Sequence, residues 1–328
     1  MSSAGFHYCC GIYHRCAHDP AKAVRAFNLA RRDGEWGFEA VSNMVEVYLG
    51  VGVGGTLPDV VIREESAVTP PSVLESVGVA QSLMQEPVML SKQSTAQYRI
   101  LLAYVAVCKG ERSRELETAT RDVMQLFTDD KTNVAALLAA CCGLLVNRSE
   151  GKAKNNLKRI YKMRFDEVRF FFFFFFSYSF YAYIFCSTHP HQSLSRARSL
   201  SQTHYEAFEQ AWLLLAVIYM KSGKQSNAQG LCQKCVQYNQ SCSKAYELLG
   251  EINERSLAYR DAAEAYLQAF LFSHELSAEV GFKLAFNYLK ADQFTKAIDV
   301  CHKVLAETPE FPRIREEILL VARKSLRL

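Results

Sequence analysis

Residues 211–238, 245–272 and 280–307 read AWLLLAVIYMKSGKQSNAQGLCQKCVQY, AYELLGEINERSLAYRDAAEAYLQAFLF and VGFKLAFNYLKADQFTKAIDVCHKVLAE, and they repeat one pattern of residues. Three alanines mark the same position of each frame and stand 34 and 35 residues apart: Ala228, Ala262 and Ala297. Another small residue stands twelve positions before each alanine, and large apolar residues surround both positions. Small residues allow two helices to cross closely, and large ones fill the space between neighbouring hairpins. The pattern therefore predicts three helical hairpins.

A period of 34 residues with these small and aromatic positions is typical of the tetratricopeptide repeat. The period continues upstream, since Ala119 and Ala153 stand 34 residues apart and residues 7–48 carry the same pattern. Residues 311–328 combine an apolar stripe with a charged face, as a capping helix does. We therefore predict an all-α fold, a tetratricopeptide-repeat helical-hairpin solenoid wound as a right-handed superhelix, with a C-terminal capping helix.

The repeat pattern divides the chain into six parts. They are expected to be N-terminal hairpins over 1–49, a Gly/Pro-rich linker over 50–72, hairpins over 73–165, a Phe-rich insert over 166–205, three hairpins over 206–310 and the capping helix over 311–328. The first hairpin has no polar cap before it, although repeat arrays normally protect their ends with a polar face. We therefore expect further repeats upstream of residue 1, in a longer protein.

The repeat register breaks between Ala153 and Ala228. One further frame would place the next alanine at position 187, so 41 extra residues intervene. They include seven consecutive phenylalanines, Phe170–Phe176, and such a run cannot form one face of a helical hairpin. Because the register resumes afterwards, we interpret 166–205 as an insertion and expect it to be disordered. The alternative is a membrane-spanning helix over Phe170–Cys186, which has the shortest length that can span a bilayer.

Composition and charge argue against several classes of function. The net charge of the 328 residues is +4 without any long Lys/Arg block, so we expect no nucleic-acid binding. The N-terminal residues do not resemble a secretory leader, which favours a cytosolic location where the cysteines stay reduced. Cys232 and Cys235 form half of a zinc motif that no second pair completes. Gly50, Gly52 and Gly55 match a dinucleotide-binding fingerprint only formally, because no strand precedes them. We expect no catalytic site, cofactor, metal or small-molecule substrate.

Several motifs narrow the prediction to one family. FKLAFNYLK (282–290), AIDVCHKVL (297–305) and RIREEILLVARKSL (313–326) follow LKRIYKM (157–163) and EAFEQAWLLLAVIY (206–219). Together they resemble the C-terminal region of the large tetratricopeptide subunit of intraflagellar transport complex A, the retrograde ciliary transport complex. The resemblance implies a role in retrograde transport and cilium assembly. It also implies other complex A subunits as partners, and a location in the cytoplasm and in the cilium or at its base.

A solenoid of hairpins presents a concave groove lined by first helices, and we expect a protein partner to bind there. The groove residues expected from the repeat template are Leu213, Val217, Met220, Lys221, Glu247, Glu251, Arg255, Phe282, Phe286 and Lys290. In a simpler interpretation, Phe282 and Phe286 pack on Ile314 and Ile318 of the capping helix. Two hypotheses follow for function: a non-enzymatic interaction scaffold of the ciliary complex, or a membrane-tethered repeat adaptor anchored through 170–186.

Overall fold

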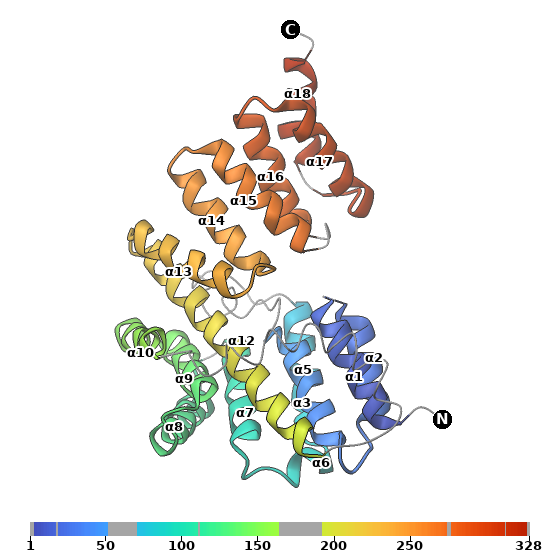
Figure 1. The fold of residues 1–328 in the computed structure, drawn as a ribbon, viewed down its shortest axis with the longest axis vertical. Helices are drawn as coiled ribbons and strands as arrows, with labels where there is room; N and C mark the ends of the chain where they lie inside the picture. Colours follow the sequence, from blue (N-terminus) through green and yellow to red (C-terminus); the bar gives the residue numbers. More distant parts are fainter. Residues whose placement is uncertain are drawn as a thin grey trace. The chain divides into compact units, whose positions relative to one another are not determined.

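The fold consists of helices throughout the described residues. The computed structural model describes residues 3–17, 19–51, 71–110, 112–163, 192–273, 277–311 and 313–326, without the side chains of 71 and 192–205 (Figure 1). Within these ranges every regular element is helical, which confirms the predicted all-α class. The chain separates into two compact units, Met1–Ala211 and Trp212–Leu328, called unit 1 and unit 2 below.

Unit 1 is built from successive helical hairpins. Its helices are α1 (Ala4–Cys16), α2 (Pro20–Ala30), α3 (Gly37–Leu49), α5 (Pro71–Met84), α6 (Pro87–Leu90), α7 (Ala96–Cys108), α8 (Arg114–Asp129), α9 (Val134–Val146) and α10 (Glu150–Lys162). Helices that follow one another pack together, as α1 does with α2 and α9 with α10. A long helix, α12 (Gln192–Lys221), begins in unit 1 and continues into unit 2. Residues 192–205, which the sequence places in the insert, are therefore helical.

Short polar residues begin several of these helices. Ser3, Asp19, Thr95, Ser113 and Asn133 stand at N-cap positions, and each side chain accepts a hydrogen bond from the backbone N–H three residues later. These bonds satisfy backbone donors that have no partner inside a helix. The local sequence therefore determines where these helices begin, independently of how they pack.

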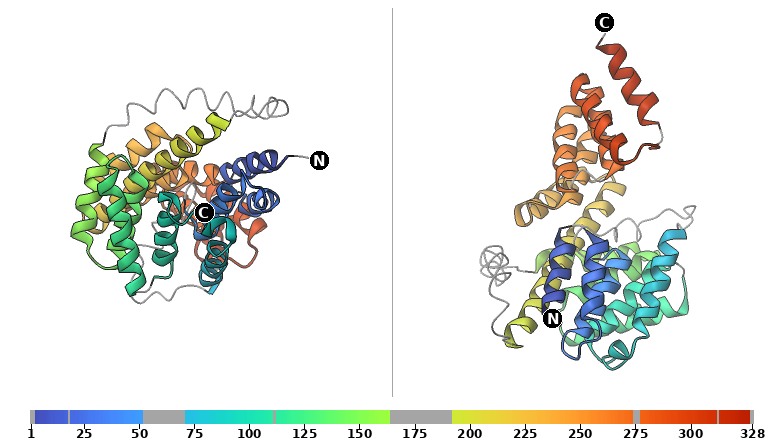
Figure 2. Two further views of the ribbon diagram at one scale, coloured as in Figure 1. Left: turned by 90° about the horizontal axis from the view of Figure 1, so that it is seen from below. Right: turned by 90° about the vertical axis from the view of Figure 1, so that its right-hand side faces the viewer.

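Unit 2 contains the three repeat frames and the capping segment. Its helices after α12 are α13 (Gln225–Tyr238), α14 (Ser243–Arg255), α15 (Tyr259–Phe272), α16 (Ala278–Lys290), α17 (Phe294–Glu307) and α18 (Leu320–Ser325). Figures 1 and 2 show α14 to α17 stacked in chain order, and each packs on the next. The capping helix, expected over 311–328, begins at Ile314 with a π-helical turn that ends at Leu319.

The repeat positions form the core of unit 2. Ala262 and Ala297 are completely buried, and so is Tyr266, four residues after the first of these alanines. Gly250 faces the ring of Tyr266 so closely that a Cβ at this glycine would lie 2.8 Å from two ring carbons. The small residue that the repeat pattern predicts at position 250 is therefore required by the close approach of α14 and α15.

The turn inside each hairpin of unit 2 uses left-handed backbone. Gly223, Leu257 and Asp292 stand 34 and 35 residues apart and have φ angles of 72°, 59° and 59°. Glycine adopts this region freely, whereas the Cβ of leucine or aspartate opposes it. Because Leu257 is 70% exposed, packing does not offset its strain. This position should therefore tolerate glycine well.

Candidate partner-binding face on α14 and α16

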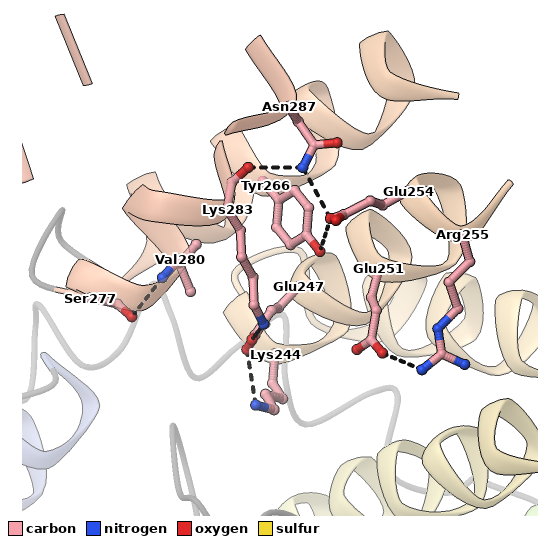
Figure 3. Close-up of polar contacts among 10 residues, drawn as sticks. All are labelled: Lys244, Glu247, Glu251, Glu254, Arg255, Tyr266, Ser277, Val280, Lys283 and Asn287. Carbon is pink, nitrogen blue, oxygen red and sulfur yellow. Dashed lines mark hydrogen bonds and ion pairs between the residues drawn. The ribbon is translucent and has the colours of Figure 1, made fainter. Parts of the chain in front are cut away.

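Side chains of α14 and α16 form one polar and aromatic surface in unit 2. This α14–α16 face consists of Lys244, Glu247, Glu251, Glu254 and Arg255 of α14 with Phe282, Lys283, Phe286, Asn287 and Lys290 of α16. Most of its polar members are drawn in Figure 3. Lys244, Glu247, Glu251 and Arg255 of α14, and Phe282, Phe286 and Lys290 of α16, recur at the three- or four-residue spacing that keeps side chains on one side. Both helices are the first of their hairpins, where the repeat template predicts the groove.

Glu247 pairs with two lysines, one on its own helix and one on α16. Its carboxylate accepts hydrogen bonds from Nζ of Lys244 at 2.9 Å and from Nζ of Lys283 at 2.7 Å. The bond from Lys283 crosses between neighbouring hairpins (Figure 3). Burial alone would raise the pKa of Glu247, but the two lysines hold this pKa below its ordinary value. The carboxylate is therefore ionised at neutral pH and holds both ammonium groups.

Glu254 makes a second link between these hairpins. Its carboxylate accepts hydrogen bonds from the hydroxyl of Tyr266 and from Nδ2 of Asn287, each at 3.0 Å (Figure 3). Tyr266 and Asn287 are completely buried, so these donors have no access to bulk water. Burial and the charge of Glu254 raise the pKa of Tyr266 well above its ordinary value. The phenol therefore keeps its proton and remains a donor.

Arg255 is held in place at the end of the face. Its guanidinium pairs with the carboxylate of Glu251 at 2.6 Å, one helical turn earlier. It also donates a hydrogen bond to the backbone carbonyl of Met220 at 3.4 Å, which connects α14 to the part of α12 in unit 2. Ion pairs as exposed as this one contribute about 1 kcal/mol or less. They therefore orient Arg255 more than they stabilise the fold.

Phe282 and Phe286 form the aromatic part of the face. Both are partly buried against a core cluster that includes Ile314, and the ring of Phe282 lies 5.9 Å from that of Phe311. This agrees with the simpler interpretation, in which the two phenylalanines pack on the capping segment. Each nevertheless keeps an exposed part. The Nζ of Lys290 lies 5.4 Å from the centre of the Phe286 ring, in cation–π geometry.

The groove residues predicted on α12 are less accessible. Leu213 and Met220 are buried, each with 4% exposure, which leaves little of either side chain for a partner to contact. Val217 is half-buried, and Lys221 is exposed. The cause is the unbroken apolar run AWLLLAVIYM, in which helical periodicity does not distinguish the buried side from the open one.

Lys283 and Asn287 were not among the predicted groove residues, although they make both links to α14. With Glu279 they are spaced four residues apart, and this periodicity alone could have placed them on the groove side. Their contacts with Glu247 and Glu254 depend on how α16 lies beside α14. Those pairings could therefore not be predicted from the sequence alone.

A second polar cluster surrounds Arg15 of α1 in unit 1. Its guanidinium donates hydrogen bonds to Glu46 at 2.6 Å, Glu206 at 3.2 Å, the amide oxygen of Asn43 at 2.5 Å and the carbonyl of Val51 at 3.3 Å. Burial alone would lower the pKa of Arg15, but Glu206 and Glu46 raise this pKa above its ordinary value. Glu206 lies 191 residues away in sequence. The cluster therefore links α1 to α12 as a structural contact.

Neither a metal site nor a membrane-spanning helix is found among the described residues. Among them, no group of three or more His, Cys, Asp or Glu side chains could hold a metal ion. Cys232 and Cys235 are buried in α13, where they pack as small residues. None of the described helices is both long and apolar enough to cross a bilayer. The alternative anchor, Phe170–Cys186, lies outside the described residues.

The stacked hairpins define the chain as a helical-hairpin repeat protein. A family model, the tetratricopeptide repeat protein 21 C-terminal ARM domain, matches residues 79–169 and 191–323. A second model, the TT21 fifth ARM repeats domain, matches residues 1–49. The chain belongs to the tetratricopeptide repeat protein 21 family.

Curated relatives are similar over nearly the whole chain. Tetratricopeptide repeat protein 21B of Homo sapiens is 34% identical over 328 residues, which are 98% of this chain and 22% of the relative. The human 21A protein is 36% identical over 330 residues, which are again 98% of this chain and 22% of the relative. The Caenorhabditis elegans homolog is 25% identical over 336 residues, which are 100% of this chain and 22% of the relative. The chain thus spans about a fifth of the length of these relatives, and the matches confirm the family resemblance drawn from the motifs.

Proposed function

We propose that this chain is a non-enzymatic protein-interaction scaffold that acts in intraflagellar transport complex A, in retrograde ciliary transport and cilium assembly. The observation that carries the proposal is membership of the tetratricopeptide repeat protein 21 family. The motif resemblance to the large repeat subunit of complex A supports it. The partners are then the other complex A subunits, and the location is the cytoplasm and the cilium or its base.

The physical basis is the surface that stacked hairpins provide. In unit 2 the hairpin of α14 and α15 packs on α13 and on α16, so first helices follow one another along one side. The α14–α16 face is such a surface, and its charged groups are held in place by Glu247 and Glu251. Contacts of this kind suit a subunit that holds other subunits together.

Co-purification from ciliated cells tests the proposal. The tagged full chain and the tagged full-length human 21B protein are expressed at equal levels, and complex A subunits are quantified in both eluates by mass spectrometry. We expect both baits to enrich them. Recovery of complex A subunits with the 21B protein but none with the soluble, correctly sized chain would refute the proposal.

Carbonate extraction of the same cells tests the alternative of a membrane-tethered adaptor, and we expect the chain in the released fraction.

A further inference from the structure

In each ion pair of the α14–α16 face, the cation is more exposed than the carboxylate. The side chain of Glu247 is 15% exposed, against 24% for Lys244 and 38% for Lys283. Glu251 is 34% exposed, against 45% for Arg255. A molecule that approaches this face therefore meets the ammonium groups of the lysines before Glu247, and meets the guanidinium of Arg255 beside the partly exposed Glu251.

An aromatic surface accompanies these cations. Lys290 is exposed, and its Nζ lies over the ring of Phe286. Phe282, one turn earlier on α16, continues the apolar surface and is also partly exposed. A ligand that matches both features carries negative charges on either side of an apolar group.

The cations are held in position before any ligand arrives. Glu247 fixes Lys244 and Lys283, and Glu251 fixes Arg255 (Figure 3). The backbone carbonyl of Met220 also accepts a hydrogen bond from Arg255. Ordering a long side chain on binding opposes association, and this cost is smaller for groups that are already ordered. The α14–α16 face is therefore prepared to bind an anionic group.

The number of cations favours a protein ligand over a nucleic acid. The face has four, Lys244, Arg255, Lys283 and Lys290. Three of these are already paired with a carboxylate: Lys244 and Lys283 with Glu247, and Arg255 with Glu251. Proteins that bind a nucleic-acid backbone strongly commonly neutralise about 6–10 phosphates. The net charge of the whole chain is only +4. A short segment with a few carboxylates fits this surface better.

We propose that the α14–α16 face binds an acidic segment of a protein partner, in which Asp or Glu residues flank an aromatic or aliphatic side chain. The carboxylates of the segment contact Arg255, Lys283 and Lys290, and its apolar side chain lies on Phe282 and Phe286. This inference rests on the proposed scaffold function and makes it specific, because it states the chemistry that the partner presents.

Fluorescence anisotropy with the purified full chain tests the inference. The probe is a labelled peptide in which Glu alternates with Leu and Phe, and the comparison peptide carries Lys in place of every Glu. The test variant is Lys290→Glu. The matched control is Lys158→Glu, an exposed position on α10 of unit 1, which changes the net charge by the same amount. Circular dichroism verifies that both variants are folded.

We expect the acidic peptide to bind the unmodified chain, more weakly as salt is added, and the Lys-containing peptide not to bind. Lys290→Glu should weaken binding of the acidic peptide about fivefold or more, while Lys158→Glu leaves it unchanged. Equal binding of the two peptides, equal losses in the two variants, or tighter binding of a single-stranded RNA oligonucleotide would overturn the inference. No complex A subunit is present in this assay, so its outcome is independent of the co-purification result.

Discussion

Replacing Gly250 by alanine should destabilise unit 2, because the crossing of α14 and α15 has no room for a Cβ. The added carbon would lie 2.8 Å from Cδ1 and Cε1 of Tyr266 and 2.9 Å from Cγ, whereas ordinary contacts begin at 3.4 Å. The ring would have to move by about 0.6 Å to restore that separation. Tyr266 is completely buried and its hydroxyl is bonded to Glu254, so the ring is not free to move.

Two effects oppose each other in this substitution. Overpacking a core costs about 1–3 kcal/mol, whereas alanine inside a helix is about 1 kcal/mol more favourable than glycine. We therefore expect Gly250→Ala to lower the free energy of unfolding by about 1 kcal/mol. Gly230 in α13 is the matched control, because it is exposed and nothing lies within 4 Å of its Cβ position. Gly230→Ala should show the helix gain alone.

Hydrogen exchange read by mass spectrometry measures these changes helix by helix in the full chain. Gly250→Ala should lower protection in α14 and α15, and Gly230→Ala should raise it in α13. The difference between the two variants should be about 1–3 kcal/mol, the overpacking effect by itself. If the two substitutions stabilise their helices equally, the crossing accommodates a Cβ and the reasoning from Tyr266 is refuted.

Three other substitutions probe separate contacts. Arg15→Met should destabilise α1 and the part of α12 around Glu206 by about 3 kcal/mol, because it leaves the largely buried carboxylates of Glu46 and Glu206 without their cation; unchanged hydrogen exchange in α1 would contradict this. Leu257→Gly should stabilise the α14–α15 hairpin by up to about 1 kcal/mol, since glycine adopts the left-handed turn freely, and a lower urea midpoint would argue against the strain. The folded-state pKa of Glu247 is lowered, so its stabilising contribution is present above the unfolded-state pKa and is lost as pH falls through the folded-state pKa. Glu247→Gln should therefore make acid unfolding less steep, and an identical acid transition would count against the lysine pairing.

The repeat core could be predicted from sequence because equivalent positions of the three frames lie in the same packing environment. Ala228, Ala262 and Ala297 recur in register, and all three are completely buried. Gly250 and Tyr266 stand twelve residues before and four residues after Ala262, and the structure brings them into contact. Because the pattern repeats three times, the features common to all three frames reflect the geometry of the hairpin and not the individual residues of one frame.

Contacts between distant helices could not be predicted in the same way. The pair between Arg15 and Glu206 joins residues 191 positions apart, and no periodicity relates α1 to α12. The burial of Leu213 and Met220 was missed because α12 is apolar on several sides. Charged residues of the α14–α16 face were mostly assigned to the correct helices, but their pairing depends on the placement of neighbouring hairpins. The local sequence pattern therefore predicts the helices, whereas the contacts between side chains of different helices depend on how those helices pack.

Two independent observations concern the Phe-rich stretch. The 34-residue repeat would place an alanine near position 187, whereas the next alanine in register is Ala228. The repeat pattern therefore indicates that residues have been added but does not give their exact bounds. The family model stops at 169 and resumes at 191, so it leaves out all seven consecutive phenylalanines. Because α12 begins at Gln192, residues 192–205 belong to the helix that follows, and residues 170–190, which the family model leaves out, account for 21 of the 41 extra residues. An addition between two hairpins interrupts few packed backbone groups, so the hairpins that carry the α14–α16 face keep their register.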